Sequence, residues 1–237
     1  MLAFLVFAGL TEFFAMALPE QKRSLLPFAV YGAFTVFTPL FNDGRIFILA
    51  IAVGFLLAAF HFLFRFTDMT AVSKEISLVA MGFLYVPFLI THLLMIRLLP
   101  DGSSWLILIM LIVMTNDSAA YYIGSAFGRH RLYEAVSPKK SIEGAIGGLF
   151  GSLIGTLIAK FTFFSSLSYA DAVITAIVIG ILGQAGDLFE SLLKRSFGVK
   201  DSGTLFPGHG GVLDRLDSII FAAPATYYYA IFLFGRF

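Results

Sequence analysis

The chain is a succession of long apolar segments separated by short polar turns. A transmembrane helix needs about 20 mostly apolar residues, and runs of about this length recur along the whole sequence. The separators contain residues that end helices, such as Asn42-Asp43-Gly44 and Pro100-Asp101-Gly102. The pattern predicts an all-α, polytopic integral membrane protein of about eight transmembrane helices. The predicted helices are 2–18, 25–41, 46–64, 76–98, 104–123, 144–164, 172–192 and 218–235.

The composition agrees with a membrane protein and excludes several classes of function. Hydrophobic residues make up 59% of the chain and charged residues 13%, whereas soluble domains have about 45–50% and about 25%. The net charge of +1 gives no reason to expect nucleic acid as a partner. Because the chain has no cysteine, disulfides, zinc thiolate sites and cysteine nucleophiles are excluded.

Lys and Arg are distributed unequally between the two sets of connections. Connections on the cytoplasmic side of a membrane carry the excess of Lys and Arg. Those after the first, third, fifth and seventh predicted helices contain Lys22, Arg23, Arg65, Lys74, Arg129, Arg131, Lys139, Lys140, Lys194, Arg195, Lys200 and Arg215. The other side has only Arg45, Arg97, Lys160 and Arg236. We therefore expect the first set in the cytoplasm and both termini outside.

No internal repeat divides the sequence, so we expect a single membrane domain over 1–237. Within it, 1–98 forms the N-terminal helices and 99–237 the half that carries the candidate chemistry. The first apolar segment ends in Ala15-Met16-Ala17, which is similar to a signal-peptide cleavage site. However, no basic residue precedes the segment and Glu12 interrupts it, so we expect a retained helix.

One polar stretch, residues 183–217, stands apart from the hydrocarbon around it. Gly183, Asp187 and Lys194 fall on one helix face, and Asp214 and Asp217 lie three residues apart. A glycine-rich turn, 207–211, separates the two groups. The stretch contains five of the fifteen acids and four of the sixteen basic residues: Asp187, Glu190, Asp201, Asp214, Asp217, Lys194, Arg195, Lys200 and Arg215.

This combination of residue types indicates phosphate chemistry with metal ions. Carboxylates supply the hard oxygen ligands that Mg²⁺ prefers, and glycines let backbone N–H groups approach phosphate oxygens. Lys and Arg neutralise the remaining phosphate charge. The alternative is a solvated loop between two membrane helices. The apparent burial of Asp187 and the four glycines Gly203, Gly208, Gly210 and Gly211 favour the phosphate site.

Three acids lie at similar depth in the predicted membrane. Glu12, Asp117 and Asp187 each precede the predicted cytoplasmic end of their helix by one to two turns. A charged side chain at the centre of a membrane helix costs about 2.5–3.5 kcal/mol on insertion scales. The sequence therefore predicts a polar pocket that opens toward the cytoplasm, with local pairing of each acid as the alternative.

Two blocks of sequence resemble a known enzyme family. The order Ser191-x3-Arg195-x4-Lys200-Asp201, Pro-Gly-His-Gly-Gly, Asp214-Arg215-x-Asp217 resembles the signature of phosphatidate cytidylyltransferases, also called CDP-diacylglycerol synthases. The run Asp117-x3-Tyr121, followed by Ser-Pro-Lys-Lys-Ser-x-Glu-Gly at 137–144, is similar to a second block of that family. The two signature blocks span 116–144 and 183–218. Members of the family usually have a longer N-terminal region with an extra span.

The resemblance implies a metal-dependent nucleotidyltransferase that converts CTP and phosphatidate to CDP-diacylglycerol and diphosphate. It places the active site at the cytoplasmic face of the inner (plasma) membrane and implies Mg²⁺, with K⁺ as one candidate for a second cation. A homodimer is a candidate assembly.

The residues that match the family's blocks receive roles by the same resemblance. The implied catalytic residues are Asp187, Asp214, Asp217, Lys200 and Arg215, of which the three aspartates would bind metal. The implied substrate-binding residues are Asp117, Lys139, Lys140, Ser191, Arg195, Asp201, Gly208, His209, Gly210 and Gly211.

Three other functions remain open on the sequence. A CTP-dependent lipid kinase, or a cytidylyltransferase for an isoprenoid phosphate or an ether lipid, would use the same groups. A cation-coupled transporter would use the acids differently, but it predicts two related halves, and no such symmetry is visible. The sequence has no GxxxxGK[ST], HExxH or GxSxG motif, which argues against P-loop, zinc-protease and serine-hydrolase chemistry.

Overall fold

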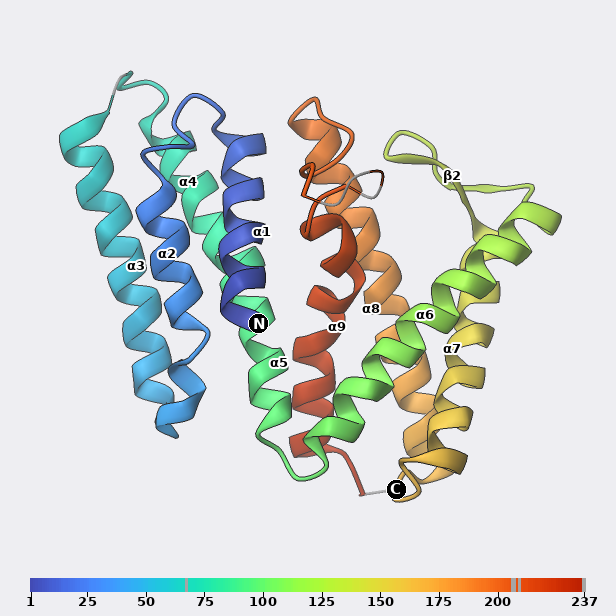
Figure 1. Ribbon diagram of the computed structural model, residues 1–237. Coiled ribbons are helices and arrows are strands. Elements are labelled where there is room, and N and C mark those ends of the chain that lie inside the picture. The colour runs from blue at the N-terminus through green and yellow to red at the C-terminus, as the bar shows by residue number, and fades with distance from the viewer. Residues whose placement is uncertain (67, 206–207, 209, 236–237) are drawn as a thin grey trace. The chain divides into compact units, whose positions relative to one another are not determined.

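The computed structural model describes residues 1–66, 68–205, 208 and 210–235, and most of these residues lie in helices (Figure 1). The helices are α1 (Leu2–Ala17), α2 (Leu26–Thr35), η1 (Thr38–Phe41), α3 (Gly44–Arg65), α4 (Val72–Phe83), η2 (Leu84–Phe88), α5 (Leu89–Arg97), α6 (Gly102–Phe127), α7 (Ile142–Thr162), α8 (Tyr169–Ser196) and α9 (Leu213–Phe232). Each of the eight predicted segments is helical over most of its length.

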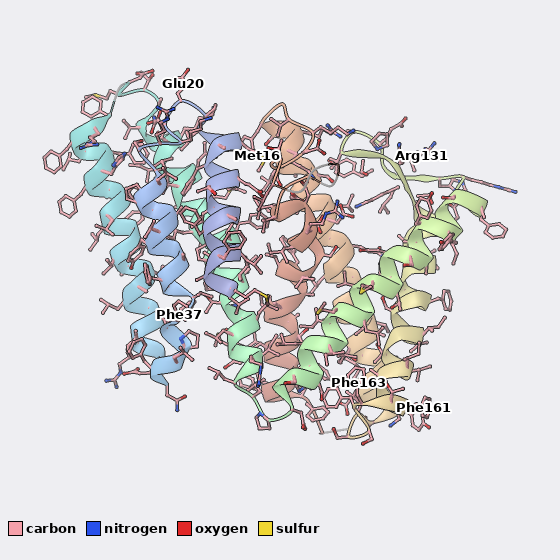
Figure 2. The ribbon with its side chains drawn as sticks, in the orientation of Figure 1. Met16, Glu20, Phe37, Arg131, Phe161 and Phe163 are labelled. Atoms are coloured by element: carbon pink, nitrogen blue, oxygen red, sulfur yellow. The ribbon has the colours of Figure 1, made fainter. Side chains whose placement is uncertain are left out.

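Within the described residues, five helical segments are long and apolar enough to cross a membrane. They are Gly44–Arg65, Val72–Arg97, Gly102–Phe127, Ile142–Thr162 and Tyr169–Ser196. Leu2–Ala17 and Leu26–Phe41 are apolar but shorter. Large apolar side chains, such as those of Phe37 and Phe161, lie exposed on the surface, as expected where lipid replaces water (Figure 2). These features confirm an all-α membrane protein, whereas eight crossings and the sidedness of the termini stay predictions.

A short β-hairpin, which the sequence analysis did not predict, lies between α6 and α7. Strand β1 (Arg131–Tyr133) pairs antiparallel with β2 (Ser137–Ser141), and Arg131 lies opposite Ser141. The register shifts by a bulge between Arg131 and Tyr133. The hairpin matters for the candidate site because β2 contains Lys139 and Lys140.

The chain forms two compact units. The N-terminal unit comprises Met1–Leu94 and Phe197–Arg215, and the C-terminal unit comprises Met95–Ser196 and Leu216–Phe237. The boundary near residue 94 lies close to the predicted division at 98. The segment 197–215, however, packs with the N-terminal helices rather than with the half that precedes it. The single membrane domain stays a prediction, and each unit is described by itself below.

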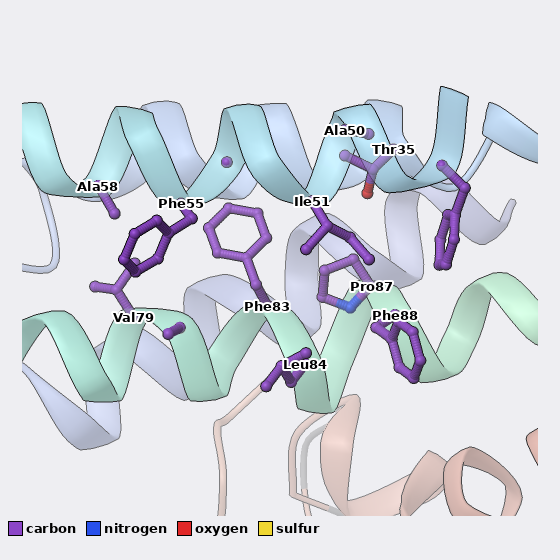
Figure 3. A pocket seen from close by; sticks show the side chains of 13 residues that line it. Thr35, Ala50, Ile51, Phe55, Ala58, Val79, Phe83, Leu84, Pro87 and Phe88 are labelled. Atoms are coloured by element: carbon purple, nitrogen blue, oxygen red, sulfur yellow. The ribbon is translucent and has the colours of Figure 1, made fainter. Parts of the chain in front are cut away.

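In the N-terminal unit, α1 packs against α2 and α4, and α3 packs against α2 and α4. Pro87 lacks a backbone N–H, and the helix widens into the π-helical turn η2 around it. An apolar cavity of about 220 Å³ lies between α3 and the α4–η2 segment (Figure 3). Phe55, Phe83 and Phe88 are among its lining residues.

In the C-terminal unit, α7 packs closely against α6 through glycines. An added Cβ at Gly151 would lie within 2.6 Å of Ala119 Cβ, and one at Gly147 within 2.5 Å of Ile123 Cδ1. Small residues at such spacing let the backbones of membrane helices approach each other. At one end of the unit, the buried ring of Trp105 contacts Phe164 and Tyr229 at centroid distances of 4.9 and 6.2 Å.

Candidate active site

Three predicted carboxylates lie together in the C-terminal unit. Asp117 of α6 interacts electrostatically with Asp187 of α8 and Asp217 of α9. Asp217 in turn interacts with Asp187, and both Asp117 and Asp217 interact with Lys140. We call Asp117, Asp187, Asp217 and Lys140 the acidic cluster. It brings three negative charges from three helices, and one positive charge from the hairpin, into one region.

Lys140 is placed by the hairpin and by the start of α7. Its Nζ lies 2.5 Å from Asp187 Oδ2, and the two side chains are 30% and 34% exposed. The next residue, Ser141, caps α7, because its Oγ accepts a hydrogen bond of 3.1 Å from Gly144 N. The neighbouring Lys139 is exposed. The sequence predicts the same role for the two adjacent lysines. In the structure Lys140 pairs with Asp187, whereas Lys139 is exposed.

Glu190 is a candidate site residue to which the sequence motifs assign no role. Its side chain is 1% exposed, and its Oε2 lies 3.4 Å from Lys194 Nζ. Asp217 also interacts with Glu190. The signal was available in the sequence, because Glu190 follows Asp187 by three residues and therefore shares its helix face.

A buried polar network fixes the helices that present the acids. Asn116 Nδ2 donates to Ser152 Oγ at 2.7 Å. Gln184 Nε2 donates to Asn116 Oδ1 at 3.1 Å and to the carbonyl oxygen of Ala145 at 2.9 Å. Asn116 directly precedes Asp117, and Gln184 lies three residues before Asp187. These hydrogen bonds join α6, α7 and α8, so they set the positions of both carboxylates.

No sequence motif assigns Ser152 or Gln184 to the site. The available signal was the presence of uncharged polar side chains inside apolar segments, which commonly form hydrogen bonds between membrane helices. Sequence spacing alone does not tell which of these side chains face each other.

Asp214 belongs to the N-terminal unit, in the first turn of α9. Its Oδ2 accepts three hydrogen bonds, from Ser202 N and Ser202 Oγ at 2.8 Å each and from Gly211 N at 2.7 Å. Gly210 has a φ of +82°, which glycine adopts readily, and a Cβ there would collide with the Asp214 carboxylate. Asp214 thus holds the end of the signature loop, residues 197–212, onto the start of α9.

Glu12 of α1 contacts the same loop. Its Oε1 accepts a hydrogen bond of 2.8 Å from Val212 N, and its Oε2 accepts one of 3.0 Å from Leu213 N. Ser202 Oγ lies 3.2 Å from Glu12 Oε2. Glu12 belongs to the N-terminal unit, and Asp117 and Asp187 belong to the C-terminal unit, so the predicted pocket shared by the three acids stays a prediction.

The remaining predicted residues lie between positions 191 and 215 of the sequence. Ser191 and Arg195 are on α8 in the C-terminal unit, where Ser191 is half-buried and Arg195 exposed. His209 lies outside the described residues. The exposed predicted residues of the N-terminal unit are Lys200, Asp201, Gly208 and Arg215. Among residues 1–66, 68–205, 208 and 210–235, no three His, Asp or Glu side chains are placed close enough to hold a metal ion.

Comparisons with known proteins identify the family. A model of the cytidylyltransferase family matches residues 1–233. The phosphatidate cytidylyltransferase of Staphylococcus haemolyticus is 39% identical over 178 residues, which are 73% of this chain and 65% of that protein. That of Bacillus subtilis is 33% identical over 155 residues, 65% of this chain and 58% of that protein. Escherichia coli YnbB, which is named an uncharacterized protein, is 36% identical over 210 residues, 86% of this chain and 66% of that protein.

The matches cover part of the length of the relatives but nearly the whole of this chain. The chain spans somewhat less than two thirds of the length of the named relatives, 65% in the Staphylococcus haemolyticus protein. The family match, in contrast, covers nearly the whole chain, including the acidic cluster and the signature loop. The family that the two sequence blocks suggested is therefore confirmed: this chain belongs to the cytidylyltransferase family.

Proposed function

We propose that the protein is a phosphatidate cytidylyltransferase, which makes CDP-diacylglycerol and diphosphate from CTP and phosphatidate. One observation carries the proposal: a chain that belongs to the cytidylyltransferase family brings a lysine and three carboxylates from separate elements into one cluster. Two relatives named phosphatidate cytidylyltransferase, at 39% and 33% identity, support the choice of CTP and phosphatidate as substrates.

The reaction needs positioning and charge neutralisation more than a strong base. A phosphate oxygen of phosphatidate attacks the α-phosphorus of CTP, a new P–O bond forms, and the bond between the α-phosphorus and its bridging oxygen breaks. Diphosphate leaves with that oxygen. Because the attacking phosphate is anionic at neutral pH, no side chain has to remove a proton from it. The protein's task is to hold several negatively charged phosphates close together.

Lys140 is the residue of the acidic cluster best suited to hold a phosphate. Its ammonium group already lies at the edge of the cluster, partly exposed, with Asp187 as its partner. A substrate phosphate can take over one of its three N–H donors while the ion pair with Asp187 fixes the side chain. The exposed Lys139 next to it adds positive charge near the membrane surface. Lys200, Arg215 and the other residues of the signature loop stay predicted phosphate contacts.

The chemistry of the acidic cluster fits Mg²⁺. Its donors are carboxylate oxygens, and a cation held by Asp187 and Asp217 would reduce the repulsion between these two charges. When bound, Mg²⁺ neutralises triphosphate oxygens and polarises the phosphoryl group under attack. Asp187 and Asp217 would hold the ion in the C-terminal unit. Asp214 is a less favourable ligand at Oδ2, which already accepts three hydrogen bonds.

The cellular setting is part of the same proposal. We place the acidic cluster at the cytoplasmic face of the plasma membrane, with eight crossings and both termini outside. The excess of Lys and Arg in the odd-numbered connections supports this orientation. K⁺ as a second cation and a homodimeric assembly are further parts of the proposal, and both rest on the resemblance alone.

The direct test uses the purified protein with phosphatidate, Mg²⁺ and CTP labelled at either the α- or the γ-phosphate. The proposal expects the α-label to enter the lipid fraction and the γ-label to leave as diphosphate. EDTA should stop the transfer and added Mg²⁺ should restore it. Entry of the γ-label alone into lipid would instead establish a lipid kinase. Replacing phosphatidate by an isoprenoid phosphate or an ether lipid separates the remaining alternatives.

A further inference from the structure

We propose that Glu12 is a positioning residue for two parts of the signature loop, around Ser202 and Val212, and that it holds them in place before CTP binds. The inference rests on the proposed function for its kinetic part. Its structural part concerns only α1, the signature loop and the first turn of α9, all of which belong to the N-terminal unit. The residues in contact are separated by 190 to 201 positions in the sequence.

The Glu12 carboxylate binds the start of α9 as an anion binds a helix N-terminus. The first N–H groups of a helix have no partner within the helix, and they carry the positive end of its dipole. Val212 N and Leu213 N both donate to Glu12, at 2.8 and 3.0 Å. Glu12, about 200 residues earlier in the sequence, therefore accepts hydrogen bonds from two backbone N–H groups. Without Glu12, these groups could bind a phosphate.

Two glycines make room for this carboxylate. A Cβ at Gly203 would lie 2.6 Å from Glu12 Oε1, and one at Gly211 would lie 2.5 Å from Glu12 Oε2. Real Cβ atoms essentially never come this close to another atom, so any other residue at either position would displace the Glu12 side chain. The loop backbone is thus fitted closely to both carboxylate oxygens of Glu12.

Ser202 connects Glu12 to Asp214. Its buried hydroxyl lies 3.2 Å from Glu12 Oε2 and 2.8 Å from Asp214 Oδ2, and its single hydrogen can serve one of them at a time. Its backbone N–H donates to Asp214 at 2.8 Å. Loss of the Glu12 carboxylate would therefore free both the start of α9 and one side of Ser202. Asp214 would keep its hydrogen bonds from Ser202 and Gly211, but the loop that contains these two donors would no longer be held by Glu12.

A loop held in place before binding lowers the cost of ordering it during binding. If only a fraction of the molecules has the competent loop, the apparent affinity for CTP falls by that fraction, while turnover at saturating CTP is retained. A purely structural role would instead reduce the amount of folded protein without changing the KM of the molecules that remain folded. The ratio of the effects on KM and kcat therefore distinguishes the two roles.

The experiment compares Glu12→Gln, Glu12→Ala and Ser202→Ala with wild type, in purified protein that elutes as a single species. Glu20→Gln is the matched control, because Glu20 is an exposed acid that lies just after α1 (Figure 2). We expect Glu12→Gln and Glu12→Ala to raise the KM for CTP by about 10-fold or more and to change kcat by less than about 3-fold. Ser202→Ala should show a smaller rise, and Glu20→Gln none.

Hydrogen exchange supplies a readout that does not depend on activity. In Glu12→Gln and Glu12→Ala, the amides of Val212 and Leu213 should exchange faster, while amides in the middle of α9 should keep wild-type protection. Unchanged exchange at both amides, or an unchanged KM for CTP with these amides exposed, would overturn the inference. If Glu12→Ala does not fold, the KM and exchange measurements on Glu12→Gln and Ser202→Ala test the inference. If wild type fails to use CTP, the proposed function falls, while the exchange measurement still tests the contact.

Discussion

At the scale of single residues, Asp187 and Asp214 differ in what satisfies their charge. Asp187 faces the ammonium of Lys140 at 2.5 Å and is one third exposed. Asp214 accepts two backbone N–H groups and the hydroxyl of Ser202 at a single oxygen. The first is suited to exchange its partner for a ligand. Asp214 is suited to hold the signature loop against α9, because its donors, Ser202 and Gly211, belong to that loop.

We expect Asp187→Asn to abolish turnover, by at least about 100-fold. The amide keeps the size of the side chain but removes the charge that would bind a cation and that fixes Lys140. The measurement is incorporation of α-labelled CTP into lipid per mole of monodisperse protein. Asp68→Asn is the control, because Asp68 is an exposed acid that contacts Thr70 in the turn before α4. Near-normal turnover of Asp187→Asn would remove Asp187 from the proposed metal site.

The two adjacent lysines of β2 allow a matched comparison. We expect Lys140→Gln to lower kcat/KM by roughly 10- to 100-fold, because it loses a charge-assisted contact next to the substrate phosphates. Lys139→Gln should lower it by less than about 3-fold, because the Lys139 side chain is exposed. Equal effects of the two substitutions would show that only the summed positive charge matters.

The sequence was sufficient to identify most of these residue types, but not their partners. Helical spacing placed Asp187 and Lys194 on one face, yet the observed partner of Asp187 is Lys140, 47 positions earlier. Glu12 was recognised as an unusual acid in an apolar segment. That it binds the backbone of Val212 and Leu213 could not be predicted, because spacing within one helix carries no information about a distant loop.

At the scale of elements, the long helices were predictable and the short ones were not. Apolar runs of 17 to 23 residues identify a membrane helix without reference to the rest of the fold. The hairpin at 131–141 has strands of three and five residues, which are too short to show a clear alternating pattern in the sequence. The π-helical turn η2 depends on how the helix accommodates Pro87, which hydropathy does not report. Helix α8 extends to Ser196 because Lys194 and Arg195 suit the negative end of its dipole.

The contact between α6 and α7 depends on a residue with no side chain. A Cβ at Gly151 would approach the backbone oxygen of Thr115 and lie 2.6 Å from Ala119 Cβ. We expect Gly151→Leu to push the two helices apart, to lower the apparent Tm by roughly 2–12 °C, and to reduce turnover by moving Asp117. Phe150→Leu, at an exposed position of the same helix, should leave both quantities unchanged. A wild-type Tm for Gly151→Leu would show that the helices can separate without cost.

At the scale of the whole molecule, the order of segments along the chain differs from their grouping in space. Residues 197–215 belong to the N-terminal unit, although α8 before them and most of α9 after them belong to the C-terminal unit. The chain therefore enters the C-terminal unit, returns to the N-terminal unit for one loop, and leaves it again. The sequence gives no sign of this return, because the loop reads as a polar connection between two apolar helices.

The absence of cysteine makes the predicted orientation directly measurable. Glu134→Cys would place a single thiol on the exposed turn of the hairpin, and Ser166→Cys would place one on the exposed turn between α7 and α8. We expect a membrane-impermeant maleimide added to intact cells to label Ser166→Cys, and to label Glu134→Cys only after the cells are opened. The reverse pattern would place the acidic cluster outside and would contradict the proposed use of cytoplasmic CTP.

The contact between Glu12 and the start of α9 also has a consequence for how the protein is made. Val212 follows Glu12 by 200 positions, so at about 5–20 residues per second its amide is synthesised roughly 10–40 s later. During this interval the Glu12 carboxylate of the first helix lacks its eventual partners. The contacts of the first helix are therefore complete only after the last third of the chain has been synthesised.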